Sequence, residues 1–164
     1  FERPVRVGDT VTVGDVTGVV TRVRIRATTI RDWDRKELIV PNKSFITERV
    51  INWTLSDPVT RLVIKVGVAY GTDVNLARDV IMQVVRANPL VMEDPKPTLY
   101  FEQFGDSSLN LVLRAYVQEL DHRLPVTHEL HLAISEALHK HEITIPFPQR
   151  DIHVYREHGT GHPT

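Results

Sequence analysis

Strand-like spacing of apolar residues, broken by glycines, dominates the first 57 residues and constrains the fold more than any other feature. These apolar positions show no helical period. They are Val11, Val13, Val16, Val19, Val20, Val23, Ile25 and Ile30. Gly14-Asp15 predicts a hairpin turn, because glycine tolerates a positive φ, and Asp32 to Lys36 predicts a second turn. Pro41 ends the strand that follows, since proline has no N–H to donate to a ladder. Four or five short strands with tight turns predict a small closed or nearly closed β-barrel over residues 1–57.

Three arginines lie within one predicted strand of this barrel. The alternation from Val19 to Ala27 places Arg22, Arg24 and Arg26 on one face. Such a positive stripe suits the phosphates of RNA or DNA, so a soluble nucleic-acid-binding module on an Sm-like barrel is the alternative function. The other interpretation is an exposed barrel face whose charge is balanced by nearby acids. No aromatic residue interleaves the arginines to stack on bases, and we expect no nucleic-acid partner.

The pattern changes after Ser56-Asp57-Pro58, because a residue before proline is pushed out of the helical region. A strand is expected at Arg61–Tyr70, followed by a helix that Asp73 caps and that ends at Asn88-Pro89. Two further strands are expected at Pro97–Phe104 and Leu109–Val117. A second helix, capped by Thr127, has Leu130, Ile134 and Leu138 on one face, and an extended segment follows at Ile143–Val154. This order predicts an α+β ferredoxin-like (βαββαβ) domain over residues 58–155. Residues 156–164 are predicted to be a disordered tail.

The final predicted strand stands alone at the end of the chain. Asp151-Ile152-His153-Val154 alternates as a strand does. It is either the edge strand of the ferredoxin-like sheet or a strand that pairs with copies of itself from other subunits, because its backbone groups are otherwise unpaired.

The composition excludes several classes of function. The net charge is −1 and no residue is cysteine, so there is no disulfide framework and no thiolate metal site. No GxSxG, P-loop, GxGxxG or cysteine nucleophile is present, and we expect no enzyme activity and no cofactor. The apolar stretches are far shorter than the roughly 20 residues that span a bilayer. The sequence opens at Phe1 without an initiator methionine or signal segment, which predicts a fragment of a longer chain.

Histidines are frequent towards the end of the chain. His128 and His131 are neighbours on one helix face and have a spacing that allows a shared metal. The pattern is not HExxH and has no carboxylate ligand at a defined offset. A solvated helix face is the preferred interpretation, and no metal site is predicted.

Motifs distributed over nearly the whole chain resemble those of the small-conductance mechanosensitive channel (MscS) family. They are Phe1-Glu2-Arg3-Pro4-Val5-Arg6-Val7-Gly8-Asp9, Gly18-Val19-Val20, Thr28-Thr29-Ile30-Arg31, Ile39-Val40-Pro41-Asn42-Lys43, Ile51-Asn52-Trp53, Gly67-Val68-Ala69-Tyr70 and Phe147-Pro148-Gln149. Residues 32–37, 45–49 and 52–57 resemble the larger MscK/MscM-like branch, whose members carry extra membrane helices and often a periplasmic region.

The resemblance implies that the parent protein is a tension-gated channel of the bacterial inner membrane, assembled as a homoheptamer. A pore-lining helix would enter just before Phe1, and the β domain would form a ring beneath the bilayer. The α/β domains would build a hollow cytoplasmic cage with side portals, which filters the ions and osmolytes released on hypo-osmotic shock. A cage can filter by portal width and lining charge without a catalytic residue.

The resemblance also assigns roles to residues. Gln103, Phe104 and Gly105 would lie near a portal, and Gln103 stands where some relatives have an acid. The last strand, with Ile152, His153, Val154 and Tyr155, would join six copies of itself in a small barrel. The face with Arg22, Arg24 and Arg26 would line the vestibule, meet a neighbouring subunit or face the lipid headgroups.

Overall fold

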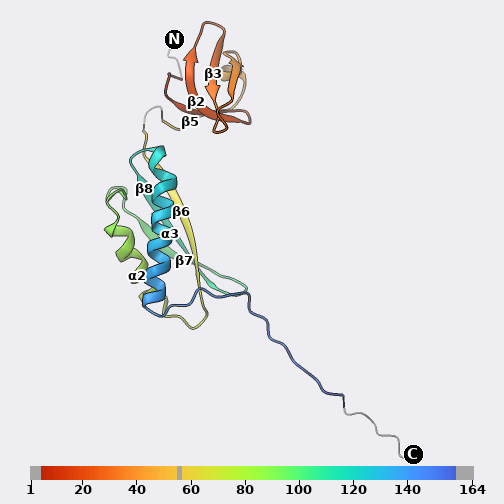
Figure 1. The fold of residues 1–164 in the computed structure, drawn as a ribbon, viewed down its shortest axis with the longest axis vertical. Coiled ribbons are helices and arrows are strands. Elements are labelled where there is room, and N and C mark those ends of the chain that lie inside the picture. The colour runs from red at the N-terminus through yellow and green to blue at the C-terminus, as the bar shows by residue number, and fades with distance from the viewer. Residues whose placement is uncertain (1–4, 55–56, 158–164) are drawn as a thin grey trace, which may run out of the picture.

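The computed structural model describes residues 5–54 and 57–157, in two units with separate hydrophobic cores (Figure 1). The first unit contains β1 (Thr10–Val13), β2 (Val16–Val23), β3 (Ala27–Arg31), β4 (Glu37–Pro41), α1 (Ser44–Thr47) and β5 (Val50–Asn52). The second contains β6 (Thr60–Val68), α2 (Val74–Ala87), β7 (Thr98–Phe104), β8 (Leu109–Val117), the 3-10 turn η1 (Leu120–His122) and α3 (Arg123–Lys140).

The first unit is one antiparallel sheet in the order β4-β3-β2-β1-β5. The turn predicted at Gly14-Asp15 is confirmed, since Val13 pairs with Val16 across it. The inward residues of the strands make a small core of Val5, Val11, Val13, Val20 and Ile30. Among the described residues β4 and β5 are the two edges and do not pair with each other, so the barrel expected from the sequence is not closed by hydrogen bonds.

The long strand predicted from Val19 to Ala27 is wrong. β2 ends at Val23, and its register against β3 shifts between Val20 and Arg22. Residues 24–26 form the turn of the β2–β3 hairpin, in which the Arg24 N–H donates to the Ala27 carbonyl. The residue types alternate from Val19 to Ala27, but a bulge and a tight turn interrupt the two-residue period of the backbone, so the alternation does not correspond to one strand. Arg24 and Arg26 therefore belong to a turn and not to a strand face.

The second unit is a three-stranded antiparallel sheet in the order β6-β8-β7, covered on one face by α2 and α3 (Figure 1). Alternate residues of β6 point to the helices and are buried, whereas Arg61, Val63 and Lys65 are exposed on the open face. The cap predicted at Asp73 is confirmed, because its carboxylate accepts from the N–H groups of Asn75 and Leu76. The predicted helix face with Leu130, Ile134 and Leu138 is buried, as expected.

Two expectations for this unit need correction. α3 begins at Arg123 and not after Thr127, whose hydroxyl donates to the Arg123 carbonyl inside the helix. Pro125 fits in this first turn because the N–H that it lacks has no partner within a helix there. The fourth strand of the sheet, predicted in Ile143–Val154, does not form, although all of these residues are described. Only Thr144 reaches the sheet, where its carbonyl accepts from the Ala69 N–H at the end of β6.

The exact limits of the two units stay a prediction, because residues 55–56, next to the expected boundary, lie outside the described residues. Most of the tail predicted to be disordered, residues 158–164, also lies outside them. No helix in the two described ranges is both long enough and apolar enough to cross a bilayer.

Candidate functional site

Motifs that are far apart in the sequence meet at the turn between β7 and β8. The Tyr70 hydroxyl, from the loop after β6, donates to the Gly105 carbonyl at 2.6 Å. The Gly105 N–H closes the turn by donating to the Ser108 carbonyl at 2.7 Å. We call Tyr70, Gln103, Gly105, Ser107 and Asn110 the hairpin corner.

Gly105 of the hairpin corner and Gly67 beside it have too little room for a larger side chain. A Cβ at Gly105 would lie 2.7 Å from Asn110 Nδ2 and 2.9 Å from the Ser108 carbonyl oxygen. A Cβ at Gly67, on β6, would lie 3.0 Å from Ser108 Oγ. The glycines in these motifs therefore allow the β6 strand and the β7–β8 turn to approach each other.

The chain beyond α3 is tied to the same corner. The Gln149 N–H donates to Ser107 Oγ at 3.0 Å, and the Gln149 side-chain amide donates to the Phe147 carbonyl at 3.0 Å. Figure 1 shows the terminal segment leaving the body beside the β7–β8 turn. The Phe147-Pro148-Gln149 motif thus sets where the last part of the chain leaves the sheet.

The predicted portal residues are all part of this turn or the strand end before it. Gln103 Oε1 accepts from Asn110 Nδ2 at 3.3 Å. Phe104 is 74% exposed and meets Phe101 edge to face, with ring centroids 4.8 Å apart. Gly105 supplies its carbonyl to Tyr70. The structure places the three together at an exposed edge, but their position at a portal stays a prediction.

An acid beside Gln103 is already paired. Arg114 Nη1 donates to Glu102 Oε1 at 2.6 Å across β7 and β8. This hydrogen bond, with the nearby charges of Arg114 and Lys65, lowers the pKa of Glu102, and Glu102 in turn raises the pKa of Arg114. Because the pKa of a carboxyl is lowered in the fold, the pair is intact above the ordinary carboxyl pKa and is lost as the pH falls through the lowered value.

The Tyr70 hydrogen bond gives a modest and specific prediction. We expect Tyr70→Phe to lower the free energy of unfolding by about 1 kcal/mol, because the Gly105 carbonyl loses a short bond at a partly exposed site. Amide hydrogen exchange should become faster at Gly105 and Ser108 and stay unchanged in β1–β3. Tyr100→Phe on the open sheet face is the control. Equal exchange in the two variants would contradict an anchoring role for Tyr70.

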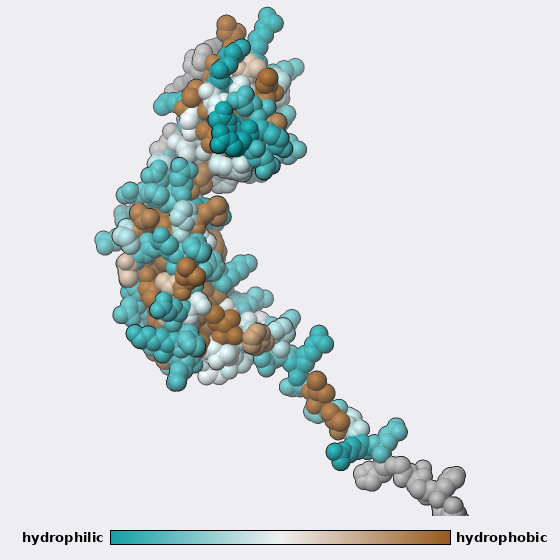
Figure 2. Space-filling model, viewed as in Figure 1, coloured by the Kyte–Doolittle hydropathy of each residue, from teal (hydrophilic) through white to brown (hydrophobic). Residues whose placement is uncertain are grey.

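The residues predicted to form an oligomer strand lie in an extended, exposed segment. Ile152, Val154 and Tyr155 are 79%, 83% and 88% exposed, and His153 is exposed too. Residues 150–157 form no strand and do not pair with any strand of the described chain. Figure 2 shows hydrophobic residues on this segment without cover from the body. Exposed hydrophobic residues on an extended segment are typical of a surface that pairs with another chain, and pairing of this segment between subunits stays a prediction.

The three arginines lie at one end of the first sheet, around the β2–β3 turn. The turn is held by Asn42, whose side-chain amide donates to the carbonyls of Arg24 and Ile25 at 2.8 and 3.0 Å. Asn42 Oδ1 accepts from the buried Thr28 hydroxyl at 2.8 Å. The local sequence around Asn42 gives no signal for this role, because its partners Arg24 and Ile25 lie 18 and 17 residues earlier in the chain.

The histidine cluster has separate partners. Within the described ranges no three His, Cys, Asp or Glu side chains gather as they would around a metal ion. His131 Nδ1 and His141 Nδ1 each lie within 3 Å of a carbonyl one turn earlier in the helix, those of Thr127 and Ala137. The geometry gives the metal hypothesis no support.

Comparison with protein families matches almost the whole chain. The family model "Mechanosensitive ion channel, beta-domain" matches residues 1–55, and "Mechanosensitive ion channel MscS, C-terminal" matches residues 62–145. Mechanosensitive channel MscK of Escherichia coli is 50% identical over 159 residues, which is 97% of this chain and 14% of that protein. Miniconductance mechanosensitive channel MscM of the same organism is 45% identical over 148 residues, 90% of this chain and 13% of that protein. The chain thus spans only a small part of these relatives.

Solved structures agree with the sequence matches. Helicobacter pylori MscS in its closed state superposes with a TM-score of 0.86 at 27% identity, covering 94% of this chain and 60% of that one. Arabidopsis thaliana MSL1 superposes with a TM-score of 0.73 at 19% identity, covering 88% and 54%, and so shares the fold. Both units of the described chain are therefore built as they are in a known channel structure.

Proposed function

Because the chain belongs to the MscS family of mechanosensitive ion channels, we propose that it forms the wall of a cytoplasmic vestibule in a tension-gated channel. The resemblance stated from the sequence motifs is confirmed, with MscK and MscM among the relatives. The family consists of channels and not of enzymes. Its named relatives are membrane channels, so the parent of this chain is a membrane protein.

The proposed assembly is a homoheptamer in the bacterial inner membrane. A pore-lining helix precedes Phe1, the Sm-like β domain forms a ring beneath the bilayer, and the ferredoxin-like domain builds a cage with side portals. Gln103, Phe104 and Gly105 line the portals, through which ions and osmolytes released on hypo-osmotic shock pass. Their exposure at a rigid, hydrogen-bonded turn supports this, because a filter needs lining groups held in place.

The exposed terminal segment is the observation that carries the proposal. Ile152 and Val154 occupy alternate positions and are almost fully exposed. Hydrophobic residues on an extended strand become buried when such strands pair and close into a barrel. The Gln149–Ser107 bond directs the segment away from its own sheet, which favours pairing between subunits over completion of the sheet.

The test is the mass of the assembled particle. We expect light scattering of the parent chain in detergent to give seven subunits, and Ile152→Asp with Val154→Asp to reduce that mass, because fourteen buried carboxylates would oppose barrel closure. Leu132→Asp, at a 60% exposed position on α3, is the matched control and should keep the heptamer. A stable monomer or dimer of the unmodified parent chain would contradict the proposal.

A further inference from the structure

One end of the β domain combines exposed cations with an exposed aliphatic side chain. The basic tip consists of Arg22, Arg24, Ile25, Arg26 and Lys43, all exposed. Ile25 stands at the apex of the β2–β3 turn and is 94% exposed. Lys43 directly follows Asn42, whose side chain and N–H bind the carbonyls of residues 24–26.

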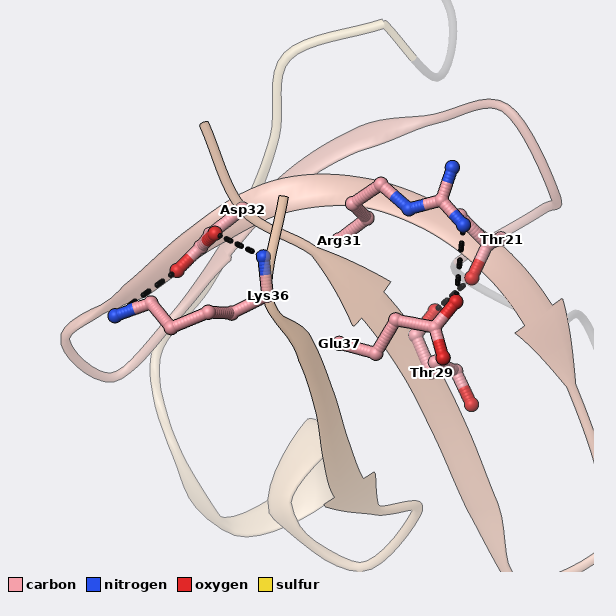
Figure 3. A network of polar contacts seen from close by, with 6 residues as sticks. All are labelled: Thr21, Thr29, Arg31, Asp32, Lys36 and Glu37. Carbon is pink, nitrogen blue, oxygen red and sulfur yellow. Dashed lines mark hydrogen bonds and ion pairs between the residues drawn. The ribbon is translucent and has the colours of Figure 1, made fainter. Parts of the chain in front are cut away.

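The cations of the basic tip have no ion-pair partner among the described residues. The next hairpin of the same sheet differs in this respect, as Figure 3 shows. There Arg31 pairs with Glu37 at 2.9 Å, and Lys36 lies 3.6 Å from Asp32. Residues 31–37 contain three cations and three acids, whereas residues 22–26 contain three cations and no acid, so of these two described hairpins the basic tip has the excess of positive charge.

The basic tip points away from the α/β unit. β3 runs from the β2–β3 turn to the Asp32–Lys36 turn, a length of roughly 15 Å. At that far end Trp33 lines a groove with Leu120, Leu124 and Pro125 of the second unit. The basic tip is thus at the end of the sheet opposite to this groove.

The backbone of the basic tip is held firmly even though its side chains are free. Asn42 fixes the carbonyls of Arg24 and Ile25, and the Asn42 N–H donates to the Arg26 carbonyl at 2.9 Å. A rigid turn loses little conformational entropy when it binds. The arrangement suits repeated contact with a surface better than the folding of a loop around a small ligand.

We propose that the basic tip docks on the anionic surface of a lipid bilayer. Arginine and lysine attract the phosphates of anionic headgroups, and a single aliphatic apex enters the headgroup region where apolar groups are stabilised. Cations alone would be enough to bind nucleic acid, but Ile25 adds nothing to phosphate binding, and the basic tip itself contains no aromatic residue to stack on bases. The docking proposal rests on the proposed function and extends it, because it identifies the basic tip as the end of the β domain that contacts the membrane.

Vesicle sedimentation of the 164-residue chain tests the proposal without requiring a heptamer. We expect binding to vesicles that contain phosphatidylglycerol and much weaker binding to phosphatidylcholine alone, with loss at high salt. Arg24→Gln with Arg26→Gln should weaken binding roughly thirtyfold. Ile25→Ser should weaken it about tenfold while preserving the preference for phosphatidylglycerol.

The matched control removes two cations from the far end of the same sheet. Lys36→Gln with Arg49→Gln changes the net charge equally and should leave vesicle binding within about twofold. Circular dichroism confirms that each variant is folded. The proposal is overturned by absence of binding at low salt, by an equal loss in the control, or by tighter binding to a single-stranded oligonucleotide than to vesicles. If the chain binds vesicles but the parent protein does not assemble, the proposed heptamer is contradicted and the docking proposal is not.

Discussion

Gly18→Ala is expected to destabilise the β domain strongly and to leave the stability of the α/β domain unchanged. A Cβ at Gly18 would lie 2.3 Å from the Arg31 carbonyl oxygen and 2.7 Å from Ile30 Cγ2, where β2 lies beside the end of β3. The carbonyl belongs to the backbone, so relief requires movement of a central strand. We expect a loss of about 3 kcal/mol in the free energy of unfolding of this domain.

Tryptophan fluorescence measures this loss selectively. Both tryptophans of the chain, Trp33 and Trp53, lie in the β domain. Urea unfolding followed by tryptophan emission should therefore show a lowered midpoint, whereas ellipticity at helical wavelengths should not change. Gly8→Ala is the control, because its added methyl group meets no atom within 4 Å and only the positive φ of 95° costs about 1 kcal/mol. Equal losses in the two variants would contradict the steric argument.

Leu113→Ala is expected to have a comparable effect on the other domain. Leu113 is fully buried on the central strand β8, between Ile64 of β6 and Leu99 of β7. Removing a buried leucine side chain leaves a cavity and lowers the free energy of unfolding by about 3–4 kcal/mol. This is a large part of the roughly 5–15 kcal/mol that stabilises a domain.

The helical signal is the appropriate probe for this variant. α2 and α3 both pack on the sheet that contains Leu113, so ellipticity should report a lowered urea midpoint. The main transition in tryptophan emission should keep the midpoint of the β domain, preceded by a small change from Trp33, which borders the second unit. Val63→Ala serves as the control, since Val63 lies on the open face of the same sheet and is 43% exposed. Its loss should remain below about 1 kcal/mol. A single shared transition in both probes would show that the two cores unfold together.

Local signals in the sequence predicted most elements of the second domain. The Asp73 cap, the helix that follows it and the two strands on either side of Gly105 all depend on neighbouring residues, and the structure confirms each of them. The start of α3 was missed because Thr127 is a good capping residue, whereas the preceding 3-10 turn leads directly into the helix at Arg123.

Non-local contacts explain what the sequence could not predict. The turn at residues 24–26 is held by Asn42, which lies 17 residues after Ile25 in the chain. Likewise Tyr70, Ser107 and Gln149 meet only after three separate segments have folded together. Tyr70 and Gln149 belong to two of the family motifs, but no local pattern in the sequence predicts their hydrogen bonds with the β7–β8 turn.

The terminal segment also has a mechanical consequence. Pulling on it would load three hydrogen bonds in the described chain in succession: Gln149 to Ser107, Ala69 to Thr144, and Ile143 to Leu138. The first of these ends on the β7–β8 turn, which contains Gly105, and the second ends one residue before Tyr70. Traction on the end of the chain would therefore reach the β7–β8 turn before it strained either hydrophobic core.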